Sequence, residues 1–168
     1  MTDPFATYSN ELRDGACENP FAALDQLCQD VIGHRLFSCS HFFLKSDGKS
    51  TAARVYTSDE RNYPRSGLKD IVPNRWTGIV IDRRKTFVAN SVDGFADVFP
   101  DHAFIASLGL GSVINLPVIL KGEFLGTINL LHNADHYQPE RLKSIGSIET
   151  AAQLAFALSS KPASPAAR

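Results

Sequence analysis

The sequence has no hydrophobic run near the roughly 20 apolar residues that a transmembrane helix needs. Its N-terminal segment also lacks the basic and apolar regions of a secretory signal peptide. We therefore expect a cytoplasmic protein that does not associate with membranes. Basic and acidic side chains nearly balance, at 17 and 18, so no excess of positive charge indicates nucleic-acid binding.

Cysteine is scarce, and its spacing matches no metal-binding motif. Cys17, Cys28 and Cys39 are an odd number and do not form a CxxC pair, so we expect free thiols in a reducing compartment. No GxSxG, HExxH or paired-carboxylate motif is present. His132 and His136 are close in the sequence, but we interpret them as solvated loop residues. The sequence thus predicts neither a metal site nor a cofactor.

The 168 residues, 43% of them hydrophobic, are enough for one domain with a continuous core. Residues 1–18 are polar and show no periodicity, which predicts a flexible N-terminal arm. Residues 160–168 are small, polar and proline-containing, which predicts a disordered tail. The folded domain is therefore expected over residues 19–159.

Helices are predicted near both ends of this domain. Asn19 as N-cap, Pro20 at the first helical position and Gly33 after the last turn delimit one helix. A second helix, of about 20 residues, is predicted from Pro139 onward. Two hairpins and an irregular crossing lie between them, so we predict an α+β fold. The terminal helices are expected on one sheet face, and a ligand pocket is expected under loops and short helices on the other.

The second hairpin, GSVINLPVILKGEFLGTINLLH over 111–132, places asparagine in both apolar strands. A three-residue loop over 120–122 keeps lysine out of a positive φ, and it places Asn115 opposite Thr127. Asn115, Thr127 and Asn129 then share one otherwise apolar face. Because buried amides need partners, this face is either the floor of a binding site or the anchor of the covering loops.

The first hairpin carries a possible anion site. A two-residue turn at Asp47-Gly48 would place His41 opposite Arg54, with Tyr56 on the same strand face as Arg54. An arginine with nearby amides suits a carboxylate or phosphate. The alternative is a solvated arginine on an edge strand. Trp76 is either an aromatic wall of the same pocket or a packing residue under a loop.

The stretch FIASLGLGSVINLPVILKGEFLGTINLLH, followed by a long amphipathic helix, resembles the second half of GAF domains. WTGIVIDRRKTFVANS resembles the segment that precedes it in that family. The resemblance covers about residues 19–159 and implies a stand-alone GAF domain. It implies an antiparallel sheet of five or six strands, with the terminal helices on one face and a ligand cavity on the other.

The resemblance also excludes several GAF subtypes. Residues 70–120 contain no cysteine, whereas free methionine sulfoxide reductases and bilin-binding GAF domains use cysteines in this region. HNADHYQPE does not supply the cyclic-nucleotide signature of the family. His102 matches the proximal histidine of haem-type GAF sensors by residue type only.

Three functions remain open at this point. The first is a sensor that binds a small polar, anionic metabolite through Arg54, Tyr56, Trp76, Asn115, Thr127 and Asn129, and signals to a separate partner. The second is an enzyme that uses the same pocket, with His41, Tyr56 or His102 as acid or base. The third is an interaction module that forms a homodimer through its terminal helices.

Overall fold

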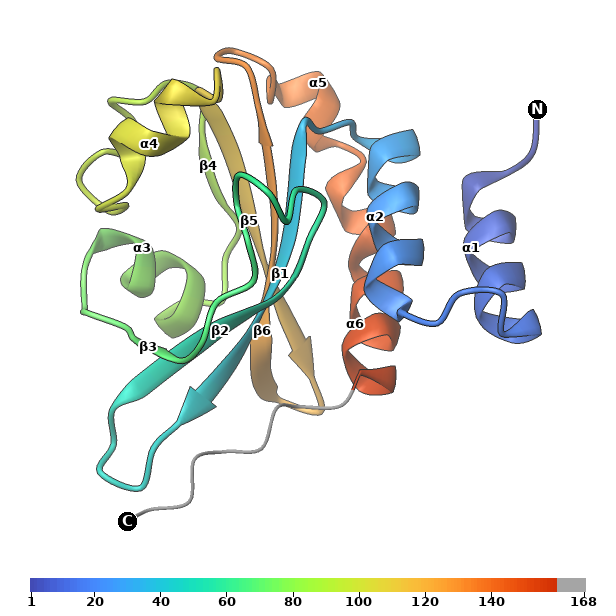
Figure 1. Cartoon of the computed structure of the whole chain (residues 1–168), viewed down its shortest axis with the longest axis horizontal. Helices are drawn as coiled ribbons and strands as arrows, with labels where there is room; N and C mark the ends of the chain where they lie inside the picture. The colour runs from blue at the N-terminus through green and yellow to red at the C-terminus, as the bar shows by residue number, and fades with distance from the viewer. Residues whose placement is uncertain (160–168) are drawn as a thin grey trace.

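The computed structural model describes residues 1–159, which form a layered α+β fold (Figure 1). The predicted tail at 160–168 lies outside the described residues. A six-stranded antiparallel sheet runs through the middle in the order β3-β2-β1-β6-β5-β4. This confirms the predicted fold class. The strands are β1 (Leu36–Leu44), β2 (Ser50–Thr57), β3 (Lys69–Asp70), β4 (Phe87–Ala89), β5 (Ser112–Leu120) and β6 (Glu123–His132).

One face of the sheet is covered by the helices from both ends of the domain (Figure 1). The first is α2 (Pro20–Val31), whose N-cap Asn19 accepts a hydrogen bond from a backbone N–H of its first turn. The predicted C-terminal helix is broken into α5 (Pro139–Leu142), a 3₁₀ turn and α6 (Glu149–Leu158). Within residues 1–159, no helix has the length and apolar character that crossing a bilayer requires.

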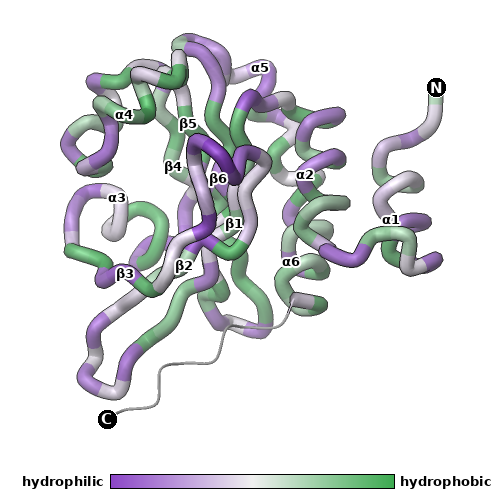
Figure 2. The backbone as a smooth tube through the Cα atoms, in the orientation of Figure 1, coloured by the Kyte–Doolittle hydropathy of each residue, from purple (hydrophilic) through white to green (hydrophobic). Residues whose placement is uncertain are grey.

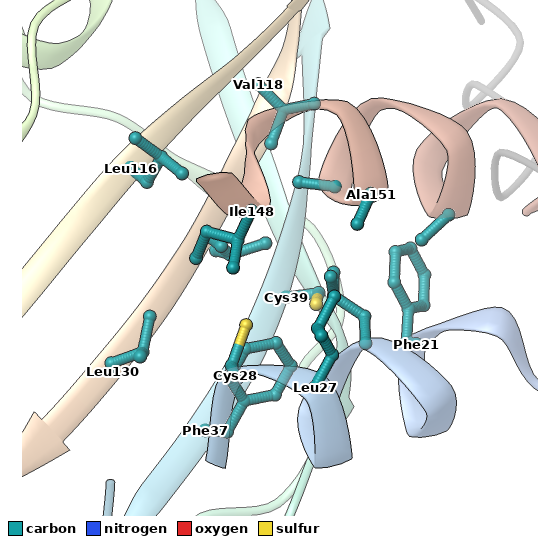
Figure 3. Close-up of a cluster of buried hydrophobic side chains, with 14 of the residues drawn as sticks. Phe21, Leu27, Cys28, Phe37, Cys39, Leu116, Val118, Leu130, Ile148 and Ala151 are labelled. Atoms are coloured by element: carbon teal, nitrogen blue, oxygen red, sulfur yellow. The ribbon is translucent and has the colours of Figure 1, made fainter. Parts of the chain in front are cut away.

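The helix-facing side of the sheet holds the larger hydrophobic core. Figure 3 shows the side chains of Phe21 and Leu27 pointing from α2 toward α6 and the sheet, and Figure 2 shows apolar residues concentrated in the central strands. Cys28 and Cys39 are fully buried in this core. Burial raises the pKa of both thiols, so they are protonated packing groups.

A further helix, α1 (Pro4–Asp14), packs on the outside of α2 (Figure 1). The prediction of a flexible arm is therefore wrong for this segment. Its boundaries carry helix signals that the polar composition concealed: Asp3 caps the first turn, and Gly15 ends the helix at φ 65°. The buried Tyr8 anchors it, because its hydroxyl donates a 2.7 Å hydrogen bond to the Ala151 carbonyl.

The opposite face of the sheet is covered by short elements and loops, hereafter the roof (Figure 1). A second hydrophobic cluster lies beneath it, around Val80, Phe95 and Ile105. The roof consists of the chain between β2 and β3, α3 (Arg75–Thr77), a π-helical turn over Gly78–Asp82, the chain after β4, and α4 (His102–Ser107).

The β5–β6 turn differs from the prediction. Leu120 pairs with Glu123, so the turn has two residues, and Lys121 adopts the positive φ, 52°, that a three-residue loop would have avoided. A bulge then inserts Leu125 opposite Val118. As a result Leu125 packs against the helices, while its neighbour Phe124 turns toward the roof.

The β1–β2 hairpin also departs from its predicted register. Lys45 pairs with Lys49, so the loop has three residues with glycine in the left-handed position, and His41 lies opposite Ala53 instead of Arg54. A bulge further along β2 shifts the register back by one residue. Because of this bulge, Arg54 and Tyr56 point to opposite faces of the sheet.

Candidate functional site

A cavity of about 480 Å³ lies between the sheet and the roof. This volume is within the range of small-molecule sites. Its floor comes from the central strands and its walls come from the roof. The floor residues are Ser38, Ser40, His41, Phe42, Ala52, Arg54, Val113, Asn115, Phe124, Gly126, Thr127, Asn129 and Leu131. The roof residues are Tyr63, Trp76, Phe99, Pro100, Asp101 and Ile105, and the edge strand β3 with the residue after it adds Lys69, Asp70 and Ile71.

A directed chain of hydrogen bonds crosses this floor. The indole N–H of Trp76 donates to Asn115 Oδ1 at 2.9 Å. Asn115 Nδ2 donates to Asn129 Oδ1 at 2.7 Å, and Asn129 Nδ2 donates to Ser38 Oγ at 3.2 Å. The two asparagines therefore line the cavity and also anchor the roof, which are the two roles that the sequence left open.

Trp76→Phe is expected to lower the free energy of unfolding by about 1 kcal/mol, because it leaves the buried oxygen of Asn115 without its donor. Urea denaturation followed by circular dichroism measures this, since the variant has no tryptophan fluorescence. Tyr63→Phe is the control: the hydrogen bond that it removes, to Asp101, is long at 3.5 Å and exposed, so a smaller loss is expected. Equal losses in the two variants would contradict the role assigned to Trp76.

Arg54 is the cation on the cavity floor, and the roof holds it in place. Its guanidinium lies 3.6 Å from the centre of the Tyr63 ring, and Nη1 donates to the Pro64 carbonyl at 2.8 Å. The hydroxyl of Tyr63 points toward Asp101. Burial raises the pKa of Tyr63, although the charge of Arg54 opposes the shift, so this hydroxyl remains a donor at neutral pH. Arg54 thus keeps N–H groups for a ligand in a fixed orientation.

The roof over Trp76 is itself fixed to the rest of the fold. Asn74 and Thr77 form a capping box at the start of α3, and Asn74 Nδ2 also donates to the Val98 carbonyl at 3.2 Å. Arg75 makes a bidentate ion pair with Asp97, at 2.9 and 2.7 Å. This pair lowers the pKa of Asp97. The aromatic wall is therefore held on both sides of the tryptophan.

Two of the predicted acid–base residues have their side chains on the wrong face of the sheet. The phenol of Tyr56 lies on the helix side, where it donates to Asp25 at 2.8 Å. His41 borders the cavity through its strand, but its imidazole packs edge-on against Phe21 and Phe156 in the helix-side core. The register shifts of β1 and β2 explain both errors.

His102 is also misplaced as a candidate, because it lies outside the cavity lining. Its Nδ1 lies 2.8 Å from the Phe99 carbonyl in the turn that precedes α4. In the described part of the chain, no cluster of three or more His, Cys, Asp or Glu side chains could hold a metal ion. The cavity lining contains none of the three cysteines. The geometry therefore gives no support to an acid–base enzyme built on His41, Tyr56 or His102.

Arg54, Trp76, Asn115, Thr127 and Asn129, by contrast, all line the cavity. Sequence reasoning missed Ser38, Ser40, Phe42 and Phe124 of the floor. A signal for the serines was present, since FSCSHF alternates polar and apolar residues as a strand with two different faces does. No comparable signal marks Phe124, whose direction depends on the bulge beside it.

Comparison with known proteins agrees with this architecture. The GAF domain family profile matches residues 22–158. Among curated proteins no significant match was found. Solved structures of similar fold include the GAF domain of a two-component sensor histidine kinase from Bacillus halodurans, which is 12% identical in sequence. The two structures superpose with a TM-score of 0.61, and the match covers 82% of this chain and 91% of that chain.

Two further GAF domain structures have a similar fold. The GAF domain of an Acinetobacter phosphoenolpyruvate-protein phosphotransferase is 10% identical, with a TM-score of 0.61, covering 94% of this chain and 95% of that chain. A phycoerythrobilin-bound GAF domain from a cyanobacterial phytochrome is 12% identical, with a TM-score of 0.64, and the match covers 92% of this chain and 93% of that chain. At these identities the structures establish the fold, and the family profile establishes membership. The chain belongs to the GAF domain family, whose fold serves as a small-molecule-binding sensor and regulatory module.

Proposed function

We propose that this GAF domain senses a small polar, anionic metabolite in the cytoplasm and passes the signal to a separate partner protein. The observation that carries the proposal is Arg54, a cation held in place on the floor of the cavity. Its position is set by Tyr63 and the Pro64 carbonyl, so little conformational entropy is lost when it binds an anion. Trp76, Asn115, Thr127 and Asn129 form the rest of the proposed binding surface.

The charges around the cavity support an anionic ligand of low charge. Asp70 forms an ion pair with Lys45 at 2.7 Å, which lowers the pKa of Asp70 and balances its negative charge. Among the ion pairs of residues 1–159, none involves Arg54 or Lys69. These two cations are therefore available to an anion that enters the cavity.

A thermal-shift screen of the purified protein tests this proposal. The library contains small carboxylates, amino acids, nucleotides and phosphates. A compound present at 100 times its dissociation constant should add about 2.7 kcal/mol of stability, which is a shift of several degrees. We expect at least one anionic compound to stabilise the protein and to bind Arg54→Ala about tenfold more weakly.

Arg61→Ala serves as the matched control, because Arg61 is exposed and lies outside the cavity lining. A stabilising compound should bind this variant as well as it binds the parent protein. A library without any stabilising compound would contradict the sensor proposal. Equal weakening in both arginine variants would contradict the role of Arg54 and leave only a general effect of charge.

The homodimer predicted from the terminal helices stays a prediction. The helix α1 covers part of the outer side of α2, so pairing would have to use the remaining surface of α6. Leu154 and Leu158 are exposed there, four residues apart on one side of the helix. Sedimentation equilibrium decides the question: a dimer lost in Leu154→Glu would support this interface, and a monomer at all concentrations would exclude it.

A further inference from the structure

The polar side chains of the cavity floor form two rows that run across the strands. Ser38 pairs with Asn129, and Asn129 pairs with Asn115; we call these three residues the closed row. Two residues further along, Ser40 pairs with Arg54 on one side and with Thr127 on the other; we call these three the open row. Neighbours within such a row lie about 5 Å apart, and the rows lie about 7 Å apart.

The closed row is occupied by its own hydrogen bonds. Its two amides bond each other, and its ends bond the Trp76 indole and the Ser38 hydroxyl. A ligand that replaced these bonds would gain little binding free energy, because each polar group of the closed row would lose one hydrogen bond for every one that it formed with the ligand. The closed row therefore supports the roof, and ligand recognition has to come from elsewhere on the floor.

The open row has the opposite character. Thr127 is only 4% exposed, yet among the hydrogen bonds of residues 1–159 none involves its hydroxyl, and none involves the hydroxyl of Ser40. Both oxygens are accessible from the cavity, so a ligand there can bond to them without displacing a protein partner. Arg54 adds N–H donors at the end of the row. Two hydroxyls beside one guanidinium match the two oxygens of a carboxylate.

An aromatic surface follows the open row. Phe42 and Phe124 meet edge to face with their ring centres 4.9 Å apart, and both line the cavity. Trp76 and Phe99 line the same cavity from the roof. A flat aromatic ring fits against such edges and faces better than a saturated ring of the same size.

The charge of the lining limits the ligand further. Asp70 is already paired with Lys45, so Arg54 and Lys69 share the lining with one unpaired carboxylate, Asp101. This leaves an excess of one positive charge, which a monoanion placed against Arg54 balances and a phosphate dianion exceeds. A single carboxylate is the anion that this balance favours.

We propose that the open row, Arg54, Ser40 and Thr127, binds the carboxylate of a small aromatic carboxylic acid whose ring lies against Phe42 and Phe124. The inference rests on the proposed sensor function and names the ligand class of the same cavity. It also assigns Asn115 and Asn129 to the support of the roof instead of to the ligand.

Titration of the full chain with benzoate, followed by protein NMR, tests this inference. Benzamide is the neutral comparison, cyclohexanecarboxylate the saturated one, and inorganic phosphate the other anion. We expect saturable binding of benzoate with shifts at the open row. Benzamide should bind at least tenfold more weakly, cyclohexanecarboxylate several-fold more weakly, and phosphate should not bind in the cavity. The double variant Ser40→Ala/Thr127→Val should bind benzoate at least tenfold more weakly.

Thr127→Ser is the matched variant, because it retains the hydroxyl, and it should bind benzoate like the parent protein. It tests the role of this hydroxyl independently of how well the Ser40→Ala/Thr127→Val double variant folds. No binding of benzoate, equal binding of benzamide, or benzoate binding unchanged in the double variant would overturn the inference. Unchanged benzoate binding in the double variant, together with weaker binding in Arg54→Ala, would leave the sensor proposal standing while removing Ser40 and Thr127 from the site. Cavity binding by a compound of another class, in place of benzoate, would likewise leave the sensor proposal standing and reject an aromatic carboxylic acid as the ligand.

Discussion

Gly126→Ala is expected to lower the free energy of unfolding by about 4 kcal/mol, a large part of the roughly 5–15 kcal/mol that stabilises an ordinary domain. A β-carbon at Gly126 would lie 1.9 Å from the Ser40 carbonyl oxygen and 2.9 Å from the Phe156 ring. The backbone there has φ 156°, which L side chains rarely adopt. Because the nearest atom belongs to the neighbouring strand's backbone, β1 and β6 would have to separate.

Gly146→Ala is the matched control, since a β-carbon at Gly146 would meet no atom within 4 Å. Its free energy of unfolding should stay within about 0.5 kcal/mol of the parent value. Urea denaturation followed by circular dichroism compares the two variants. A loss of less than about 1 kcal/mol in Gly126→Ala would mean that the two central strands do not pack as closely as described.

Acidification is expected to destabilise the protein through a pair of stacked histidines. The rings of His132 and His136 lie parallel, with centres 3.4 Å apart. Burial lowers the pKa of His132 to about 4, and His136, Arg35 and Arg141 add to the shift. Burial and Arg141 also lower the pKa of His136. Both imidazoles are therefore neutral in the folded protein at neutral pH.

The direction of the pH effect follows from this shift. An unfolded histidine takes up a proton near pH 6.5, whereas the folded His132 does so near pH 4. The unfolded state binds more protons between these values, so stability falls as the pH drops from about 6.5 to 4. Partial exposure of the pair limits the loss to about 2 kcal/mol.

Urea midpoints measured between pH 4 and pH 8 test this expectation. The parent protein should lose stability below pH 6.5, and His132→Gln should show a shallower dependence over the same interval. Above pH 7 the two curves should run parallel, because His132 is neutral in both the folded and the unfolded state. Equal slopes below pH 6.5 would show that other groups govern the acid response.

Much of the fold could be predicted from local sequence signals. The cap at Asn19 and the apolar stripes of the terminal helices define the helix layer. The alternation of polar and apolar residues over 111–132 predicts a hairpin with two different faces. The N-terminal helix was missed because its 11 residues bury a single side chain, Tyr8, which leaves too weak an apolar pattern to recognise.

The site was harder to predict because it depends on register. On β6, the two-residue turn and the bulge each shift the pairing by one residue, so Asn115 lies opposite Asn129 instead of Thr127. A shift of two residues restores the original face, which is why the asparagines were assigned to the correct side. On β2 the bulge lies between Arg54 and Tyr56, so one was placed correctly and the other was not.

The division of the cavity floor into two rows has a consequence for how ligand preference could change over evolution or by design. Substitutions in the closed row break bonds that hold the roof, so they are costly to the fold. Ser40 and Thr127 are different, because their hydroxyls have no hydrogen-bond partner among the described residues, whereas Arg54 bonds the Pro64 carbonyl of the roof. These two positions can therefore be randomised as a small library for biosensor engineering, with Arg54 and the scaffold left intact.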